Sequence, residues 1–394
     1  MTKTLVSLFS GIGGFELGFA RAGYTPLLFC EIDPAAKAVL SAAWPDVTLV
    51  DDVQLLPELP ACDVITAGFP CQDLSQAGRK AGIFGERSNL VSHLFRLLRD
   101  MTFEPEWVVV ENVPFMLSLD GGTAMDFVLS QFEELGFAWA YRVVDARAFG
   151  LPQRRPRVIL VASRKNDPRM ALATEALPPL VDEKPIIVRK GSAYGFYWTE
   201  GTRGLGWVRD GLPPIKGGSG LGIPSAPAIW FPALNILGTP TIEDAERLQG
   251  FPSGWTATAL ADGRKAGARW KLVGNAVNVR VAEWLAKQLD LDHKAPAPAT
   301  ADLAAGRWPN SAYGANGGRG RLDLNLFPQR EPMQPIMTFL DADPKPLSYR
   351  AAAGFLRRAE TTPKLVYSPQ FLDFLRAYCL ATGDDASLKT ALAS

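Results

Sequence analysis

Cys71 is the residue with the clearest capacity for chemistry, in the tetrapeptide Phe69-Pro70-Cys71-Gln72. It follows an apolar run, 63–68, that is typical of a buried strand, and it precedes a Gly-rich polar stretch, 75–88, that is typical of a loop. The thiol is therefore expected at the carboxyl end of a strand, where open α/β sheets bind their ligands. A lone cysteine is more often a small buried side chain, so a nucleophile requires other reactive groups beside it.

Two further polar groups are predicted at the same edge of the sheet. Glu111-Asn112-Val113 follows the apolar run 107–110, and Gln153 to Arg157 precedes the apolar run 158–162. A carboxylic acid there can protonate or hydrogen-bond a ring nitrogen, and a thiolate attacks electron-poor ring carbons. Guanidinium groups recognise carbonyl oxygens and phosphates, and they lower the pKa of a nearby thiol.

A glycine-rich turn, Phe9 to Gly14, lies between a predicted strand and a predicted helix. Glu31 lies about twenty residues after Gly11, the spacing at which an acid meets ribose hydroxyls in nucleotide-binding α/β folds. The glycines depart from the GxGxxG pattern, so a nucleoside without a pyrophosphate fits the turn as well as a dinucleotide does. A turn with a purely structural role is the remaining alternative.

The elements that must position these groups alternate between strand and helix. Strands are predicted at 5–9, 25–30, 48–50, 63–67, 107–110, 142–144 and 156–162, and helices at 15–22, 34–43, 90–100 and 123–135. This alternation predicts an α/β fold with a doubly wound, mostly parallel sheet over residues 1–165. Residues 166–240 are rich in Pro, Gly and Trp, which indicates a small, irregular, β-rich second domain.

The rest of the chain is predicted to return to the first domain and then to extend beyond it. Helices are expected at 241–248 and 275–289, with 241–269 as the connection between the domains. Residues 292–330 are rich in Pro, Ala and Gly and are expected to form a linker or extended wrap. Phe371, Leu372, Phe374, Leu375 and Tyr378 have helical spacing, which predicts a helix that packs on the body of the protein.

Composition limits the class of protein. The 394 residues have zero formal net charge and 47% hydrophobic content, which fits a globular protein better than one that coats nucleic acid nonspecifically. No apolar run is long enough to span a bilayer, and the first residues lead into a strand, so no membrane contact and a cytoplasmic location are expected. Four cysteines without a CxxC pair and two histidines predict no metal site.

In the order of these motifs the chain resembles the cytosine-5 DNA methyltransferases, the bacterial or phage modification methylases in particular. The resemblance covers residues 4–290. It rests on Phe9 to Gly14, Glu31, Asp52, Gly68 to Gln72, Glu111 to Val113, Gln153 to Arg157, Arg247 to Pro252 and Gly274 to Val277. It implies a Rossmann-like fold that binds S-adenosyl-L-methionine, with 1–165 and 270–291 as the catalytic domain and 166–240 as the target-recognition domain.

The resemblance also implies a role for each residue. Cys71 attacks carbon 6 of a cytosine, Glu111 contacts ring nitrogen 3 and the amino group, and Arg155 holds the carbonyl oxygen. The residues implied in cofactor binding are Phe9, Gly11, Gly14, Glu31, Ile32, Asp52, Val53, Leu90, Asn275 and Val277. Those implied in contacts with the base or the DNA are Pro70, Ser75, Arg79, Arg87, Arg157 and Lys216.

Double-stranded DNA is the implied substrate, and the target cytosine must leave the helical stack before carbon 5 can be reached. Residues 74–89 are then expected to close over the flipped base. A monomer is expected, with a restriction endonuclease of the same target site as a candidate partner. Three alternatives remain: an RNA cytosine methyltransferase, a noncatalytic DNA-binding regulator and a nucleotide-dependent oxidoreductase. The target sequence and the role of residues 292–394 do not follow from the sequence.

Overall fold

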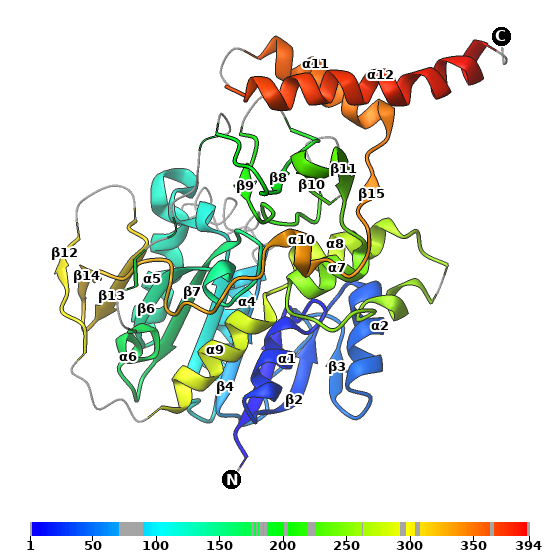
Figure 1. Cartoon of the computed structure of the whole chain (residues 1–394). Helices are drawn as coiled ribbons and strands as arrows, with labels where there is room; N and C mark the ends of the chain where they lie inside the picture. Colours follow the sequence, from blue (N-terminus) through cyan, green and yellow to red (C-terminus); the bar gives the residue numbers. More distant parts are fainter. Residues whose placement is uncertain are drawn as a thin grey trace.

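A ten-stranded sheet forms the centre of the larger part of the molecule (Figure 1). The computed structural model describes residues 2–70, 90–174, 177, 178, 180, 184, 187–200, 204–218, 226–261, 263–291, 297–303, 308–362 and 366–391, the last eight as backbone only. The strand order is β12-β14-β13-β6-β7-β5-β4-β1-β2-β3. The strands are β1 (Thr4–Leu8), β2 (Thr25–Cys30), β3 (Thr48–Val50), β4 (Val64–Ala67), β5 (Trp107–Asn112), β6 (Ala138–Asp145), β7 (Pro156–Ser163), β12 (Ala301–Asp302), β13 (Ser311–Ala315) and β14 (Gly318–Arg321).

The predicted α/β fold is confirmed. Strands β1 to β5 pair in parallel, with β1 between β2 and β4, so the chain turns outward in both directions from the first strand. Strand β7 is antiparallel to both β5 and β6, so β6 again runs in the direction of β1 to β5. Strands β13, β14 and β12 continue the sheet with antiparallel pairs. The edge where the parallel strands end is the edge predicted for the chemistry.

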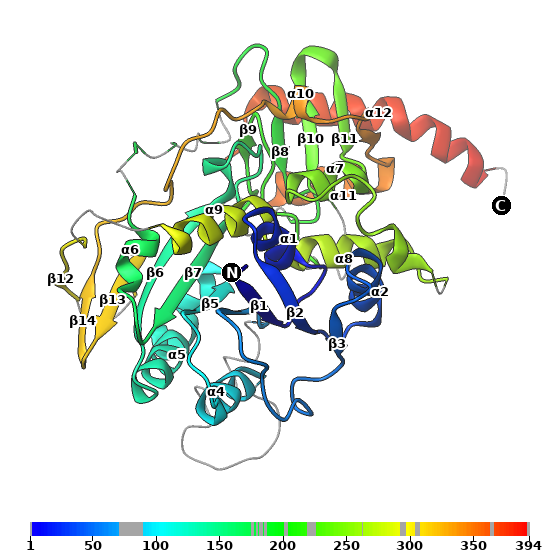
Figure 2. The same ribbon diagram turned by 90° about the horizontal axis from the view of Figure 1, so that it is seen from below.

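Helices cover both faces of this sheet. Figure 2 shows α4 (Leu90–Asp100) and α5 (Thr123–Glu134) on one side, opposite α1 (Gly14–Arg21), α6 (Pro168–Leu172) and α9 (Val279–Asp290). The alternation of side chains along β1 explains this: Val6 and Leu8 belong to the core below α4, and Leu5 belongs to the core below α1 and α9. Helix α2 (Pro34–Ala43) begins at Asp33, whose side chain accepts a hydrogen bond from the Ala35 amide.

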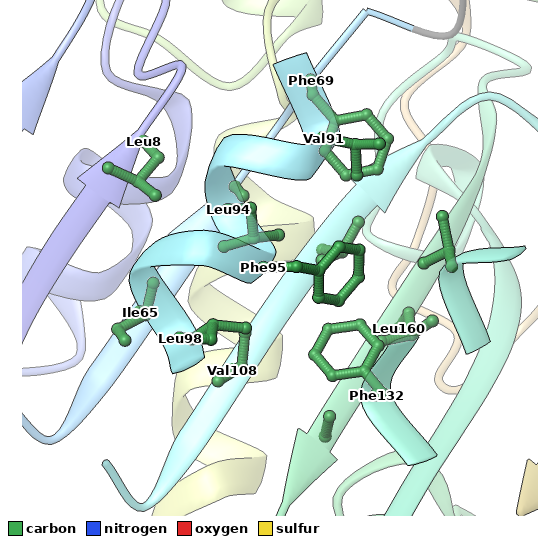
Figure 3. Close-up of a cluster of buried hydrophobic side chains, with 14 of the residues drawn as sticks. Leu8, Ile65, Phe69, Val91, Leu94, Phe95, Leu98, Val108, Phe132 and Leu160 are labelled. Carbon is green, nitrogen blue, oxygen red and sulfur yellow. The ribbon is translucent and has the colours of Figure 1, made fainter. Parts of the chain in front are cut away.

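The core below α4 supports the strand end that leads to Cys71. Figure 3 shows Val91, Leu94, Phe95 and Leu98 of α4 against Leu8, Ile65 and Val108 of the sheet, with Phe132 and Leu160 beside Phe95 and with Phe69 at the top. All of these side chains are at most 3% exposed. Each contributes about 1.5–3 kcal/mol of burial free energy. The last described residues before Cys71 are therefore anchored on a rigid base.

A second, smaller sheet has the order β15-β11-β10-β8-β9, with antiparallel pairs throughout. Its strands are β8 (Tyr194–Phe196), β9 (Val208–Arg209), β10 (Ala228–Phe231), β11 (Ile236–Thr239) and β15 (Lys345–Pro346). Helices α11 (Tyr349–Thr361) and α12 (Pro369–Ala391) lie against it (Figure 1). Phe371 and Leu375 are 0% exposed at this contact, as the helical spacing of the apolar residues predicts.

The two parts are joined by α7 (Ile242–Leu248), η5 (Ala257–Leu260) and α8 (Gly267–Asn275), which lead back to α9. Within residues 292–330, expected as a linker or wrap, 301–302, 311–315 and 318–321 form strands of the large sheet. These strands consist mainly of small residues, which carry no clear strand pattern. Gly314 is required there, because a Cβ at this position would lie 2.4 Å from the Trp139 ring. Among the described helices, none is long and apolar enough to cross a membrane.

Candidate active site

The glycine-rich turn after β1 has the backbone of a ligand cradle. Phe9, Gly11 and Gly13 all have positive φ, at 58°, 58° and 85°. The carboxylate of Glu31, at the end of β2, accepts hydrogen bonds of 2.7 Å from the amides of Gly11 and Asp33. Burial raises the pKa of Glu31, and these two backbone amides oppose that shift. Glu31 thus ties the turn to the neighbouring strand and keeps free lone pairs for hydroxyl donors.

The segment around Val277 lies directly on this turn, although it is late in the sequence. A Cβ on Gly14 would lie 2.3 Å from the Val277 carbonyl oxygen, so only glycine permits this approach. A Cβ on Gly68 would lie 3.7 Å from Val277 Cγ2 and 3.8 Å from the Phe9 carbonyl oxygen. Phe9, Gly14 and Val277 are therefore brought together, as the sequence predicts for one pocket. Asn275, two residues earlier, is exposed.

Asp52 and Val53 lie in a turn after β3. Asp52 accepts a hydrogen bond from the Gln54 amide, and Val53 is buried. Arg96 of α4 donates to the carbonyl oxygens of Val53 (3.2 Å) and Leu56 (2.8 Å), which fixes the turn to the helix. The sequence analysis missed Arg96, because it lies among apolar residues of an amphipathic helix and no local motif singles it out. Leu90 begins α4 and is half-buried against the core, whereas Ile32 is 67% exposed.

Glu111 and Arg157 form an ion pair at the rim of the sheet. The distance from Arg157 Nε to Glu111 Oε1 is 3.0 Å, and both side chains are largely buried. Burial raises the pKa of Glu111, with the positive charges of Arg157 and Arg155 opposing the shift. Next to it, Asn112 Nδ2 donates to the Phe69 carbonyl oxygen at 3.1 Å. The acid and its arginine are therefore held close to the chain that enters the tetrapeptide of Cys71.

The described part of the chain stops at Pro70 and resumes at Leu90, so it does not include the predicted nucleophile. Pro70 is exposed, directly before Cys71. Cys71, Ser75, Arg79 and Arg87, together with the predicted loop 74–89, lie outside the residues that the structure describes. Burial raises the pKa of both Cys30 and Cys62 to about 12, and it also raises that of Cys379. None of the three cysteines that the structure describes is thus an activated thiol.

Arg155 is in a different position from the one expected of a residue that holds a substrate oxygen. Its guanidinium donates to the carbonyl oxygens of Ile215 (3.0 Å), Gly274 (3.0 Å) and Ala276 (2.7 Å), and the residue is 1% exposed. Its own backbone amide donates to Asp145 Oδ1 at 3.2 Å. The arginine that contacts Glu111 is Arg157. The sequence pattern could not distinguish them, because both belong to one motif two residues apart.

Lys216 lies between the two parts of the molecule. Its Nζ is 3.9 Å from the centre of the Tyr197 ring and 3.3 Å from Glu200 Oε1, and its side chain is 43% exposed. Gln153 fixes the neighbouring backbone, since it accepts from the Ile215 amide and donates to the Leu248 carbonyl oxygen. The position of Lys216 is compatible with contact to a ligand that lies between the two sheets.

Comparison with known proteins adds independent evidence. Residues 3–189 match the family model of the C-5 cytosine-specific DNA methylases. The chain is 48% identical over 376 residues to the type II methyltransferase M2.BsuMI of Bacillus subtilis strain 168, covering 94% of this chain and 97% of that protein. It is 36% identical to M.BsuFI of Bacillus subtilis over 40% of this chain and 38% of that protein. The solved structure of the Entamoeba histolytica methyltransferase EhMeth has a TM-score of 0.52 and 17% identity, over 73% of this chain and 98% of that one.

Proposed function

Because the chain belongs to the C-5 cytosine-specific DNA methylases, we propose that it transfers a methyl group from S-adenosyl-L-methionine to carbon 5 of a cytosine in double-stranded DNA. The observation that carries this proposal is the buried Glu111–Arg157 pair beside Phe69-Pro70. This pair supplies an acid of raised pKa on β5 and a guanidinium on β7, next to the end of β4, the strand that leads to Cys71.

The residues around the glycine-rich turn fit the cofactor. Phe9, Gly11 and Gly13 have positive φ angles, which make a tight turn directly after β1, and Glu31 retains acceptor capacity for the ribose hydroxyls. Asp52 and Val53 are proposed to contact the adenine. Leu90, Ile32, Asn275 and Val277 are proposed to complete the pocket. When bound, the cofactor supplies an electrophilic methyl group on a sulfonium centre.

In the proposed mechanism Cys71 adds as a thiolate to carbon 6 of the flipped cytosine, which breaks the aromaticity of the ring. Glu111 hydrogen-bonds ring nitrogen 3 and the amino group, and so stabilises the electron-rich ring that forms. Carbon 5 would then take the methyl group, with the electron pair of the broken S–C bond left on the sulfonium sulfur. Loss of the proton on carbon 5 and expulsion of Cys71 then restore the ring. For the carbonyl oxygen of the base we propose Arg157 in place of Arg155, because Arg157 pairs with Glu111 whereas Arg155 donates to three backbone carbonyls.

Residues 166–240, which contain strands β8 to β11 of the second sheet, are proposed to read the DNA, with Lys216 among the contacts. The two relatives named above are both called type II methyltransferases. We therefore propose that this chain also protects DNA from an endonuclease of the same target site. It is proposed to act as a monomer in the cytoplasm.

A covalent trap tests the proposed reaction. Sequencing that distinguishes 5-methylcytosine, on DNA from a host that expresses the chain, first identifies the target site. A duplex with 5-fluorocytosine at that position should then form a stable adduct with Cys71, because no proton can leave carbon 5. Cys71→Ser should abolish methyl transfer while DNA binding persists, and Cys379→Ser is the matched control. An adduct that peptide mapping assigns to Cys30 or Cys62, or methylation of tRNA in preference to duplex DNA, would refute the proposal.

A further inference from the structure

Arg155 joins three segments that are far apart in the sequence. Its Nη1 donates to the carbonyl oxygen of Ile215, and its Nη2 donates to those of Gly274 and Ala276. The side chain is almost fully inaccessible to solvent, and burial lowers its pKa well below the usual value. Among the described residues, these three carbonyl oxygens are the hydrogen-bond acceptors of the guanidinium, and Nε has no acceptor. Because a buried charge is costly unless it is hydrogen-bonded, the three carbonyl dipoles are needed to stabilise it. A shift of the segment at Ile215, or of the segment at 274–276, would leave N–H donors of the buried guanidinium without acceptors.

The two segments that Arg155 holds are also packed backbone against backbone. A Cβ on Gly274 would lie 2.2 Å from the Gly217 amide nitrogen and 2.3 Å from the Lys216 carbonyl carbon. A Cβ on Gly217 would lie 2.2 Å from Asn275 Oδ1. Real Cβ atoms do not approach backbone atoms this closely, so only glycine at position 274 allows the contact, whereas the exposed Asn275 side chain can move away from a Cβ at position 217. We call this contact, with Arg155 beneath it, the 215–276 junction: residues 215–217 and 274–276.

Each side of the 215–276 junction leads to one ligand of the proposed reaction. On one side, Lys216 contacts Tyr197 and Glu200, next to β8 of the second sheet, and Tyr197 also donates to the Pro214 carbonyl oxygen at 2.8 Å. On the other side, Val277 follows Ala276 and lies on Gly14 of the glycine-rich turn. A displacement of the second sheet is therefore passed to the cofactor pocket through two consecutive stretches of backbone.

We propose that Arg155 is a positioning residue that couples DNA engagement by the second domain to cofactor binding in the first. This inference rests on the proposed function. DNA that draws residues 215–217 into place also fixes 274–276, and hence Val277, against the cofactor turn. By linkage, bound cofactor favours the DNA-bound arrangement of residues 215–217 to the same extent. Arg155 acts through the backbone and needs no contact with the base.

The coupling is measurable as a ratio of two dissociation constants. S-adenosyl-L-homocysteine is titrated into the full chain by calorimetry, first alone and then with a saturating duplex that carries the mapped target site. In the unchanged protein the duplex should lower the dissociation constant by roughly fivefold or more, the lower end of common coupling factors. In Arg155→Lys the ratio of the dissociation constant without duplex to that with duplex should fall towards one. An ammonium group cannot bind three carbonyl oxygens at once as a planar guanidinium does.

Two glycine variants test the junction without removing the arginine. Gly274→Ala forces residues 216–217 away from 274 and should also bring the ratio towards one, so it decides the question if Arg155→Lys fails to fold. Gly218→Ala is the matched control, because its Cβ would meet nothing within 4 Å, and it should keep the ratio of the unchanged protein. Arg157→Lys should lower kcat and leave the ratio unchanged.

Three results would overturn the coupling: a ratio of one in the unchanged protein, an unchanged ratio in Arg155→Lys, or an unchanged ratio in a folded Gly274→Ala. A purely structural role would weaken both affinities in parallel and would keep their ratio. Failure of the proposed function is distinguished from failure of the coupling by a different measurement: the unchanged protein would not methylate cytosine. The two binding constants report the coupling whether or not methyl transfer follows.

Discussion

Glu16 is an ionisable residue in an unusual position, on the buried face of α1 immediately after the glycine-rich turn. It is 0% exposed. Burial raises its pKa from 4.5 to about 7, with the hydroxyls of Ser7 and Ser10 acting in the opposite direction. The folded protein therefore binds a proton at Glu16 more tightly than the unfolded chain does. Near neutral pH, α1 carries a carboxyl group that changes its charge inside the core.

This position predicts a specific dependence of stability on pH. As the pH rises from about 4.5 to about 7, the unfolded chain loses the Glu16 proton before the folded protein does, so the free energy of unfolding falls. Glu16→Gln should remove that loss. It should raise the free energy of unfolding at pH 8 by up to a few kcal/mol and change it little at pH 4.5. Urea denaturation across this range measures the difference, with exposed Glu58→Gln as the control. A Glu16→Gln curve parallel to that of the unchanged protein would contradict the assignment.

At the scale of elements, the contact between α1 and α9 fixes a late segment of the chain against the helix that follows β1. A Cβ on Gly18 of α1 would lie 2.5 Å from Ala282 Cβ and 2.7 Å from the Val279 carbonyl oxygen. The two helices thus approach closely along the face of α1 that also carries Gly14, which contacts Val277 just before α9 begins. The separation of α1 and α9 sets the position of Val277 over the glycine-rich turn.

Gly18→Ala should therefore destabilise the protein although alanine is the better helix former. Overpacking of this kind costs about 1–3 kcal/mol, and displacement of Val277 should also weaken binding of S-adenosyl-L-homocysteine. Gly354→Ala, within α11, is the matched control, because its Cβ would have no neighbour closer than Arg358 Nη1 at 3.5 Å. This change should raise the free energy of unfolding by about 0.5–1 kcal/mol. Urea midpoints and calorimetric affinities measure both effects. Equal stability of the two variants would show that α1 and α9 can separate without cost.

The sequence predicts those elements whose signal is local and fails where the signal is tertiary. Strands β1 to β5 are apolar runs and α2 has its cap in the sequence, so their bounds could be predicted almost to the residue. Strands β12 to β14 could not, because their strand character depends on pairing with β6 and with one another. The same holds at the site: Glu31, directly after β2, and Glu111, in the last two residues of β5, follow from their positions at the ends of apolar runs. The pairing of Glu111 with Arg157 depends on side-chain directions that one sequence does not specify. The same is true of the hydrogen bonds from Arg96 to the carbonyl oxygens of Val53 and Leu56.

At the scale of the whole molecule, the last hundred residues complete both parts of the fold. Strands β12 to β14 extend the large sheet, and β15 pairs with β11 at the edge of the small one. Helices α11 and α12 then cover the aromatic side chains of the small sheet, among them Phe196, Trp207 and Trp230. The small sheet has few strands and cannot bury these rings alone. The proposed DNA-reading part therefore depends on the C-terminal helices for its core.

Phe371 of α12 is the centre of that contact. Its ring centroid lies 5.1 Å from that of Phe196, 5.2 Å from that of Trp207 and 4.9 Å from that of Trp230. Phe371→Ala should cost about 3–5 kcal/mol and should lower the affinity for the target duplex. Binding of S-adenosyl-L-homocysteine without DNA should persist, because its proposed pocket belongs to the large sheet. Leu380→Ala on the same helix, at a side chain 75% exposed, is the control. Thermal unfolding and fluorescence anisotropy with labelled duplex measure the two effects. If Phe371→Ala binds DNA as the control does, the C-terminal helices are dispensable for DNA binding.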